Sequence, residues 1–225
     1  MRTVDKPIEA FIFDMDGVLT DTVEYHFQSW QQLAAELNLA FSRKDYEQLL
    51  GLSRSDSMKL FLQGRPTTAA DFQQLLTKKN ECFLQLIEHL SPANLLPGVS
   101  NLLNEIKQAG FKLAVASSSR NTPVILSRLK IAALFDAVSD SNTIGQAKPA
   151  PDLFLDAARR LGALPQACVV FEDSAAGVEA GLAAGMLVVG IGDMLVCKAH
   201  LRYPAMAAVN LGQILAYQHG AGKSI

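Results

Sequence analysis

Short apolar segments that alternate with helical patterns are the feature of this sequence that most restricts its fold. Each segment is apolar on both faces, as strands inside a parallel sheet are. They lie at residues 8–13, 111–116, 167–171 and 186–191. Helical patterns lie before and between the last three, at residues 98–109, 121–129, 152–161 and 174–184. The alternation predicts an α/β fold: a doubly wound, Rossmann-like parallel sheet with right-handed crossovers.

A long helical stretch interrupts this alternation after the first apolar segment. Apolar residues spaced by three and four run through residues 23–37, 43–50, 55–62 and 69–90. Residues 19–22 precede the stretch, and the turn-forming sequence SPANLLPG at 91–98 ends it. We therefore expect an α-helical cap at residues 22–95, inserted into an α/β core made of residues 1–21 and 96–225.

The composition excludes several classes of partner. Of the 225 residues, 49% are hydrophobic, and 20 Lys and Arg against 22 Asp and Glu leave a formal net charge of -2. Because there is no basic stripe, nucleic acid and anionic membranes are poor partners. No apolar run reaches the roughly 18 residues of a membrane span. A soluble, cytoplasmic protein is expected, and a monomer.

Cysteine and histidine, the usual ligands of zinc, show no zinc-binding spacing. Cys82, Cys168 and Cys197 are far apart, and the 4 histidines form no HxxxH or HExxH pattern. Unpaired thiols suit a reducing compartment, and we expect all three to be buried packing residues.

Acidic side chains follow two of the predicted strands. Asp14 and Asp16 follow the first strand, and Glu172 and Asp173 follow the third. Ligands of open parallel sheets bind outside the carboxyl ends of the strands, so these carboxylates converge if the two strands are neighbours. Like charges so close repel unless they are protonated or neutralised. Oxygen ligands without His or Cys favour Mg²⁺ as the neutralising cation.

Groups suited to binding phosphate occur at two other places in the sequence. Ser117, Ser118 and Ser119 follow the second predicted strand, and Lys148 stands between turn residues in AKPAPD. Hydroxyls and free backbone N–H groups at a helix N-terminus bind anions. A metal, phosphate-binding groups and a carboxylate able to attack phosphorus together indicate aspartyl-phosphate chemistry.

In this combination the sequence resembles the haloacid dehalogenase superfamily. That superfamily has DxD after the first strand, Ser after the next core strand, Lys before PxPD and an acidic pair after a third strand, in the order found here. Within it the chain is similar to the β-phosphoglucomutases, which carry an α-helical cap. The resemblance extends to about Gly192 and includes DGVLTDTVEYHFQSW, GLSRSDS, SPANLLPG, SSSRN, AKPAPDLF and EDSAAG.

The resemblance implies roles for the core residues. Asp14 would be the nucleophile that carries the phosphoryl group, and Asp16 the general acid and base, with its backbone carbonyl on Mg²⁺. The side chains of Asp14, Glu172 and Asp173 would complete the metal site. Ser117 and Lys148 would hold the transferring phosphoryl oxygens.

The resemblance also implies a substrate site formed by cap residues and one core loop. Arg54 would bind the phosphate that is not transferred, because a guanidinium binds phosphate bidentately. The other expected substrate-binding residues are Thr22, His26, Trp30, Gly51, Leu52, Ser57, Lys79, Ser118, Ser119, Arg120 and Asn121. At Leu50 the sequence departs from the Lys that is common in the mutases, which leaves the sugar specificity open.

Each of these residues also has a structural interpretation. Glu172 could be a solvated carboxylate, or could lie beside the metal ligands without binding the metal itself. Ser118 to Arg120 could be a helix N-cap with a surface arginine. His26 and Trp30, four residues apart, could pack together in the cap. Arg54 and Lys79 could be solvated helix charges.

The predicted reaction interconverts β-D-glucose 1-phosphate and glucose 6-phosphate through an aspartyl-phosphate and β-glucose 1,6-bisphosphate, with Mg²⁺ as cofactor. Cap closure would keep water away from phosphorylated Asp14. A sugar-phosphate phosphatase on the same scaffold is the alternative enzyme, and its product would be inorganic phosphate. A phosphosugar-sensing protein is the non-enzymatic alternative, which the intact Asp14 and Asp16 disfavour, since a sensor needs no nucleophile.

Overall fold

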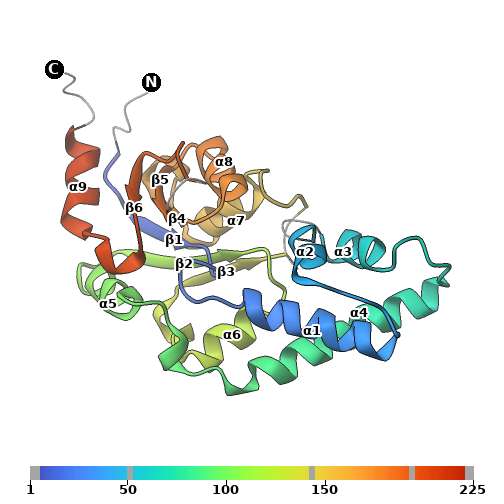
Figure 1. The fold of residues 1–225 in the computed structure, drawn as a ribbon. Coiled ribbons are helices and arrows are strands. Elements are labelled where there is room, and N and C mark those ends of the chain that lie inside the picture. The colour runs from blue at the N-terminus through green and yellow to red at the C-terminus, as the bar shows by residue number, and fades with distance from the viewer. Residues whose placement is uncertain (1–5, 50–52, 142–144, 193–195, 221–225) are drawn as a thin grey trace. The chain divides into compact units, whose positions relative to one another are not determined.

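The computed structural model describes residues 6–49, 53–141, 145–192 and 196–220 (Figure 1). The chain separates into two compact units, a core of Met1–Asp21 with Ser91–Ile225 and a second unit of Thr22–Leu90.

Residues 91–95, which the sequence analysis assigned to the cap, belong to the core unit. Hydrogen bonds join them to the loop after the first strand: Thr20 Oγ1 donates to the Asn94 carbonyl at 2.8 Å. Close by, Leu96 N donates to the Leu19 carbonyl at 3.0 Å. The two connecting segments are therefore tied to each other on the core.

The core unit is built around a six-stranded parallel sheet in the order β3-β2-β1-β4-β5-β6. The strands are β1 (Ala10–Phe13), β2 (Lys112–Ser117), β3 (Ala137–Asp140), β4 (Cys168–Glu172), β5 (Leu187–Ile191) and β6 (Leu201–Tyr203). The strand order reverses at β1, which has β2 on one side and β4 on the other. The predicted doubly wound α/β fold is confirmed.

The two edge strands, β3 and β6, were not predicted from the sequence. β3 has only 4 residues, two of them half-buried, and β6 has 3 residues. Because an edge strand packs against one neighbour only, it carries a weaker apolar pattern than a central strand.

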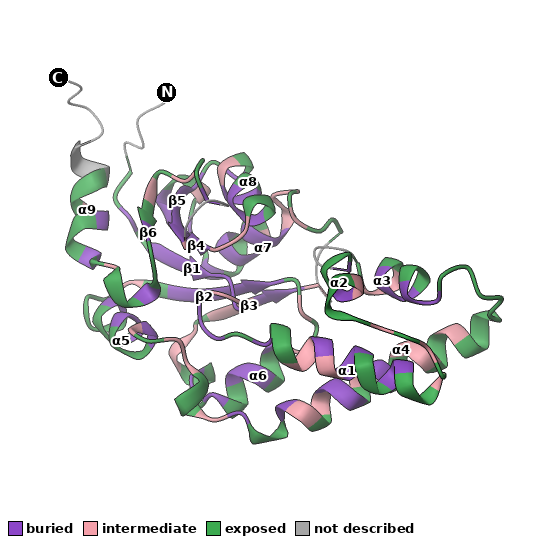
Figure 2. Ribbon diagram, in the orientation of Figure 1, coloured by how far each residue is buried: buried purple, intermediate pink, exposed green. Residues whose placement is uncertain are grey.

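Helices cover both faces of the sheet. They are α5 (Val99–Gln108), α6 (Thr122–Arg128), α7 (Asp152–Leu161), α8 (Ala175–Ala183) and α9 (Leu211–Gly220), with the short 3-10 turns η2 (Pro92–Asn94), η3 (Ala132–Leu134), η4 (Pro165–Ala167) and η5 (Met206–Ala208). Helices α7 and α8 share one buried cluster with Ile12 and Val170. On the other face, the ring of Phe13 stacks on that of Phe171, with centroids 4.6 Å apart. The central strands β1, β2, β4 and β5 are accordingly buried on both sides (Figure 2).

The second unit is entirely helical over its described residues. It contains α1 (Val23–Glu36), α2 (Arg43–Glu47), α3 (Arg54–Phe61), α4 (Ala69–Leu86) and the 3-10 turn η1 (Ile87–His89). Its own apolar cluster includes Trp30, Leu33, Met58 and Phe61. The unit thus has a core independent of the sheet.

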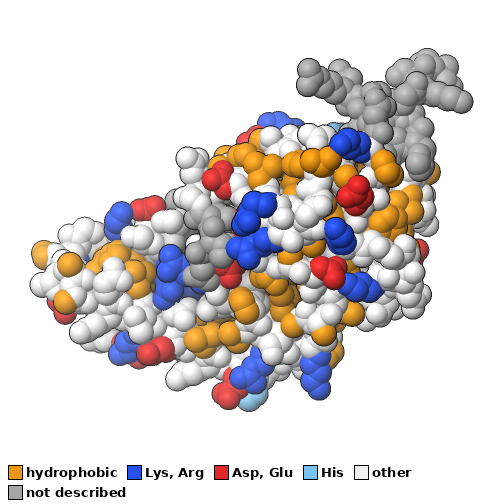
Figure 3. Space-filling model, turned by 180° about the vertical axis from the view of Figure 1, so that it is seen from behind, with side chains coloured by type: hydrophobic (Ala, Val, Ile, Leu, Met, Phe, Trp, Pro, Cys, Tyr) orange, Lys and Arg blue, Asp and Glu red, His pale blue; other side chains and the backbone are white. Residues whose placement is uncertain are grey.

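Two surface properties bear on the predicted partners. Among the described helices, none combines the length and the apolar character needed to cross a bilayer. On the face shown in Figure 3, acidic and basic side chains are interspersed.

One cysteine prediction was wrong: Cys82 and Cys168 are buried, but Cys197 is exposed.

Candidate active site

Asp14 and Glu172 lie side by side because their strands are neighbours. Phe13, the last residue of β1, is in register with Phe171 of β4. The residues that come next along these two strands, Asp14 and Glu172, are therefore level with each other at the carboxyl edge of the sheet. Asp14 N donates to the Phe171 carbonyl at 3.0 Å, which continues the strand pairing into the site. The condition for convergence of the carboxylates is met.

Lys148 joins these two carboxylates from a distant part of the sequence. Its Nζ donates to Asp14 Oδ1 at 2.6 Å and also to Glu172 Oε1. The side chains of Lys148, Asp14 and Glu172 are 9%, 11% and 1% exposed. Although burial opposes the charge on Lys148, the two carboxylates raise the pKa of its ammonium group. Lys148 is therefore a buried ion-pair partner and not a surface charge.

The other carboxylate oxygen of Glu172 is bound by the start of α8. Glu172 Oε2 accepts hydrogen bonds from Ser174 N at 2.8 Å and from Ser174 Oγ at 3.0 Å. Ser174 is the N-cap of α8, and its Oγ accepts from Gly177 N at 3.0 Å. Ser174 was not among the predicted site residues, although a Ser just before a helix is the usual signal for such a cap.

Asp14, Glu172 and Asp173 form an acidic cluster in which one oxygen of each lies within 4.8 Å of the others. Burial, and then the charge of Glu172, raise the pKa of Asp173 to about 7. Burial likewise raises the pKa of Asp14 well above its usual range, against the opposing effect of Lys148. Three carboxylates share one ammonium group here, so the cluster has an excess of negative charge.

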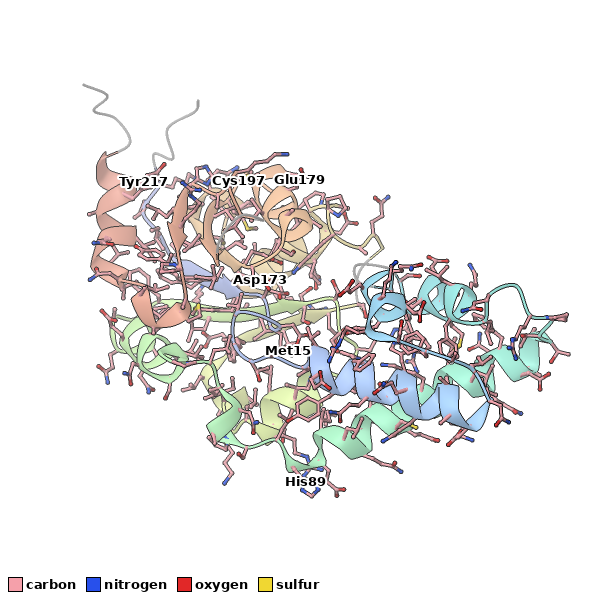
Figure 4. The ribbon with its side chains drawn as sticks, in the orientation of Figure 1. Met15, His89, Asp173, Glu179, Cys197 and Tyr217 are labelled. Carbon is pink, nitrogen blue, oxygen red and sulfur yellow. The ribbon has the colours of Figure 1, made fainter. Side chains whose placement is uncertain are left out.

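This donor set fits Mg²⁺, which prefers carboxylate oxygens. Asp16 is half-buried on the loop after β1, and its charge also raises the pKa of Asp14 and of Asp173. It therefore lies close to the cluster. Asp173 and Met15, labelled in Figure 4, mark the loops after β4 and β1 that carry these residues.

Ser117 ends β2, the strand on the other side of β1, and is buried. Its Oγ accepts a hydrogen bond from Ser119 N at 3.1 Å. Ser119 Oγ in turn accepts from Asn121 N at 3.2 Å, so this loop is held by its own polar groups. Ser118 and Arg120 are exposed beside them. All five residues of this loop that were predicted to bind substrate thus lie at or just after the carboxyl end of β2.

His26, Lys79 and Arg54 form a basic cluster in the second unit. Lys79 Nζ lies 2.8 Å from His26 Nδ1, and the His26 ring stacks on Phe83 with centroids 3.9 Å apart. Lys79 is only 7% exposed, so it is not a solvated surface charge. Burial, and then the charge of Arg54, lower the pKa of Lys79 to about 7. Burial, and then Lys79, hold the pKa of His26 well below its usual range.

The remaining predicted residues of this unit are more ordinary in their contacts. Trp30 is buried in the apolar cluster, with its ring 4.8 Å from that of Phe61, and Lys79 Nζ lies 5.2 Å from the Trp30 ring. Ser57 Oγ donates to the Leu49 carbonyl at 3.5 Å. Thr22 is buried at the start of α1. Gly51 and Leu52, with the departure at Leu50, lie outside the described residues.

Known proteins match this chain over most of its length. The chain is 44% identical over 190 residues to a β-phosphoglucomutase of Bacillus subtilis strain 168, covering 83% of this chain and 84% of that protein. A crystal structure of β-phosphoglucomutase from Clostridium difficile superposes with a TM-score of 0.88 at 32% identity, covering 95% and 98% of the two chains. A phosphorylated carbohydrates phosphatase of Thermotoga maritima is 29% identical, covering 80% and 82%.

The profile of one protein family matches most of the core and all of the second unit. It is described as haloacid dehalogenase-like hydrolase, and it matches residues 8–185, which include Asp14, Ser117, Lys148 and Asp173. The match therefore contains each of the four motifs that the sequence analysis identified. The chain belongs to the haloacid dehalogenase-like hydrolase family.

Proposed function

We propose that this protein is a Mg²⁺-dependent β-phosphoglucomutase that interconverts β-D-glucose 1-phosphate and glucose 6-phosphate. The observation that carries the proposal is the Lys148 ammonium held between Asp14 and Glu172 at the carboxyl edge of the sheet, in a chain 44% identical to a β-phosphoglucomutase. The second unit, Thr22–Leu90, is the cap of this enzyme.

Asp14 is the nucleophile of the proposed reaction. Its carboxylate oxygen attacks phosphorus of β-glucose 1,6-bisphosphate, a P–O bond to Asp14 forms, and the P–O bond to the sugar breaks. Attack requires the ionised carboxylate, and the neighbouring Lys148 favours that form although burial opposes it. Ser117 and Lys148 bind the transferring phosphoryl oxygens, where preorganised donors stabilise developing charge.

Asp16 moves the proton in each half of the reaction. It donates a proton to the sugar oxygen that leaves when Asp14 is phosphorylated, and it accepts one from the sugar hydroxyl that attacks phosphorylated Asp14 in return. The next sugar phosphate enters with its other end toward Asp14, so the bisphosphate is regenerated and the phosphate changes position on the sugar.

The metal site of this proposal is formed by the Asp14, Glu172 and Asp173 side chains with the Asp16 backbone carbonyl. A bound Mg²⁺ would neutralise charge on the transferring phosphoryl group. Burial, and then the charge of Glu172, raise the pKa of Asp173 to about 7, and a bound cation would favour its ionised form.

The basic cluster of the cap supports a mutase because a mutase must hold a second phosphate. The charge of the half-buried Arg54 acts on the buried Lys79, and a phosphate dianion would relieve that repulsion. A plain phosphatase requires no second phosphate site. Hydrolysis remains the second candidate, because a phosphorylated carbohydrates phosphatase is among the relatives.

A coupled assay tests the proposal. Purified protein with Mg²⁺ and β-glucose 1-phosphate should form glucose 6-phosphate, at a rate that depends on added β-glucose 1,6-bisphosphate and far exceeds release of inorganic phosphate. Phosphate released from many sugar phosphates without any bisphosphate requirement would instead identify a phosphatase.

A further inference from the structure

Two glycines stand where any side chain would overlap a carboxylate of the site. A β-carbon built on Gly17 would lie 1.9 Å from Asp173 Oδ2, and one built on Gly177 would lie 1.8 Å from Glu172 Oε1. Heavy atoms that are not bonded do not approach so closely, so one partner would have to move. The Asp173 side chain is labelled in Figure 4.

Other glycines in the core unit face different neighbours. A β-carbon on Gly98 would lie 2.5 Å from Ala207 Cα, and one on Gly190 would lie 2.5 Å from Val196 Cβ. Those substitutions would push against backbone or against packed side chains close to the backbone. A β-carbon on Gly110 would meet nothing within 4 Å.

We propose that Gly17 and Gly177 are positioning residues whose missing β-carbons make room for the Asp173 and Glu172 carboxylates. Because the obstructed atoms are the ends of side chains, a substitution displaces the carboxylate before it disturbs the fold. The inference rests on the proposed function only in taking these carboxylates as ligands of a divalent cation.

The contacts of Gly177 show how far such a displacement would spread. Glu172 Oε2 is bound by Ser174, the N-cap of α8, and Gly177 lies in the first turn of the same helix. Glu172 Oε1 accepts from Lys148. A side chain at Gly177 would therefore shift Glu172, which is both the ion-pair partner of Lys148 and a ligand of the proposed metal site.

The two substitutions differ in their backbone cost, which makes them a useful pair. Gly17 has a φ of +75°, so alanine is strained there whatever the space around it. Gly177 lies in the first turn of α8, where alanine fits the helical backbone without strain. A loss of metal binding in Gly177→Ala can therefore not be attributed to backbone strain.

The test measures Mg²⁺ binding without substrate, by calorimetry and by the rise of the melting temperature when Mg²⁺ is added. In Gly17→Ala and Gly177→Ala we expect the Kd for Mg²⁺ to rise by about 10- to 100-fold, which is the range for loss of groups that orient metal ligands. Gly110→Ala is the matched control for Gly17, because its φ of +85° imposes the same strain beside open space. It should keep the wild-type Kd.

Double variants show whether each glycine acts through its carboxylate. In an Asp173→Ala background, Gly17→Ala should cause no further change in the Kd for Mg²⁺. In a Glu172→Ala background, the same should hold for Gly177→Ala.

Wild-type Mg²⁺ affinity in both glycine variants, or losses that add fully in the double variants, would overturn the inference. Absence of Mg²⁺ binding by the wild-type protein would instead contradict the metal site of the proposed function, and the inference with it.

Discussion

The core site and the basic cluster of the cap both crowd like charges into a buried place, but they deal with the repulsion differently. In the core, Lys148 pairs with Asp14 and Glu172, and Ser174 binds the free oxygen of Glu172. In the cap, Lys79 contacts His26 and aromatic rings, and no described carboxylate forms an ion pair with it.

Pairing therefore keeps the Lys148 ammonium of the core charged, whereas the basic cluster of the cap reduces its charge by releasing protons. Lys79 has a pKa of about 7, and the pKa of His26 is held well below its usual range. A cation that binds the transferring phosphoryl oxygens in every cycle is best kept permanently charged. A site that binds a phosphate for part of each cycle can acquire its positive charge together with the ligand.

Loss of the core nucleophile should have the largest effect. Asp14→Asn should reduce turnover by more than about 10⁴-fold, because the amide cannot form the acyl phosphate. The melting temperature should change little, since burial already disfavours the ionised form of the Asp14 carboxyl group and raises its pKa. Activity in the coupled assay and far-ultraviolet circular dichroism check both parts. Retained turnover would refute the assigned chemistry.

Loss of the core counter-ion should affect both activity and stability. Lys148→Ala should lower kcat/KM by about 10²- to 10³-fold. It should also lower the free energy of unfolding by about 3 kcal/mol, because Asp14 and Glu172 lose their buried partner.

Added Mg²⁺ should reduce this stability deficit, since the cation replaces part of the lost positive charge. Urea unfolding with and without Mg²⁺ measures the change. An equal deficit in both conditions would show that Lys148 and the metal do not share the same carboxylates.

Loss of the cap guanidinium should affect binding of the bisphosphate more than the chemical step. Arg54→Ala should raise KM for β-glucose 1,6-bisphosphate by about 10- to 100-fold, and Arg54→Lys should restore it only in part, because an ammonium group cannot bind phosphate bidentately. Lys59→Ala is the matched control on the same helix, since Lys59 is exposed and paired with Asp56. An unchanged KM in Arg54→Ala would remove Arg54 from the second phosphate site.

Removal of the buried cap lysine should give the smallest effect on stability, and with the opposite sign. The ammonium group of Lys79 has a pKa of 10.5 when unperturbed and about 7 in the folded protein. Between these values the unfolded chain binds more protons, so the free energy of unfolding rises with pH; this stabilisation is complete above 10.5 and is lost as the pH falls toward 7.

At pH 7, Lys79→Met should therefore stabilise the protein by about 1 kcal/mol, while turnover falls. It should also flatten the dependence of unfolding on pH above neutrality. Lys78→Met is the control, because Lys78 is exposed and pairs with Glu36 at 2.5 Å. Destabilisation by Lys79→Met would show that the buried ammonium is paired, as in the core.

Much of the fold followed from local patterns. The segment 152–161, predicted as a helix, is α7 with the same bounds, and the four central strands lie at the apolar segments. The edge strands β3 and β6 were missed because they are short and have a neighbour on one side only. Local periodicity reports burial on both faces, which edge strands lack.

The candidate site divides in the same way. The residue types after each strand indicated a metal and phosphate site, but the ion pairs of Lys148 and the hydrogen bonds from Ser174 to Glu172 had no sequence pattern to announce them. The burial of Lys79 was also unpredicted, because a lysine on a helix is usually exposed.

The sequence by itself determined which side chains leave the ends of the strands and that the sheet would be parallel. Only the tertiary structure decided that β1 and β4 are neighbours, that one ammonium group lies between Asp14 and Glu172, and that Gly17 and Gly177 clear the space of two carboxylates. The physical reason is that periodicity records how each segment is buried, whereas the distances between charges depend on strand order and helix packing over the whole core.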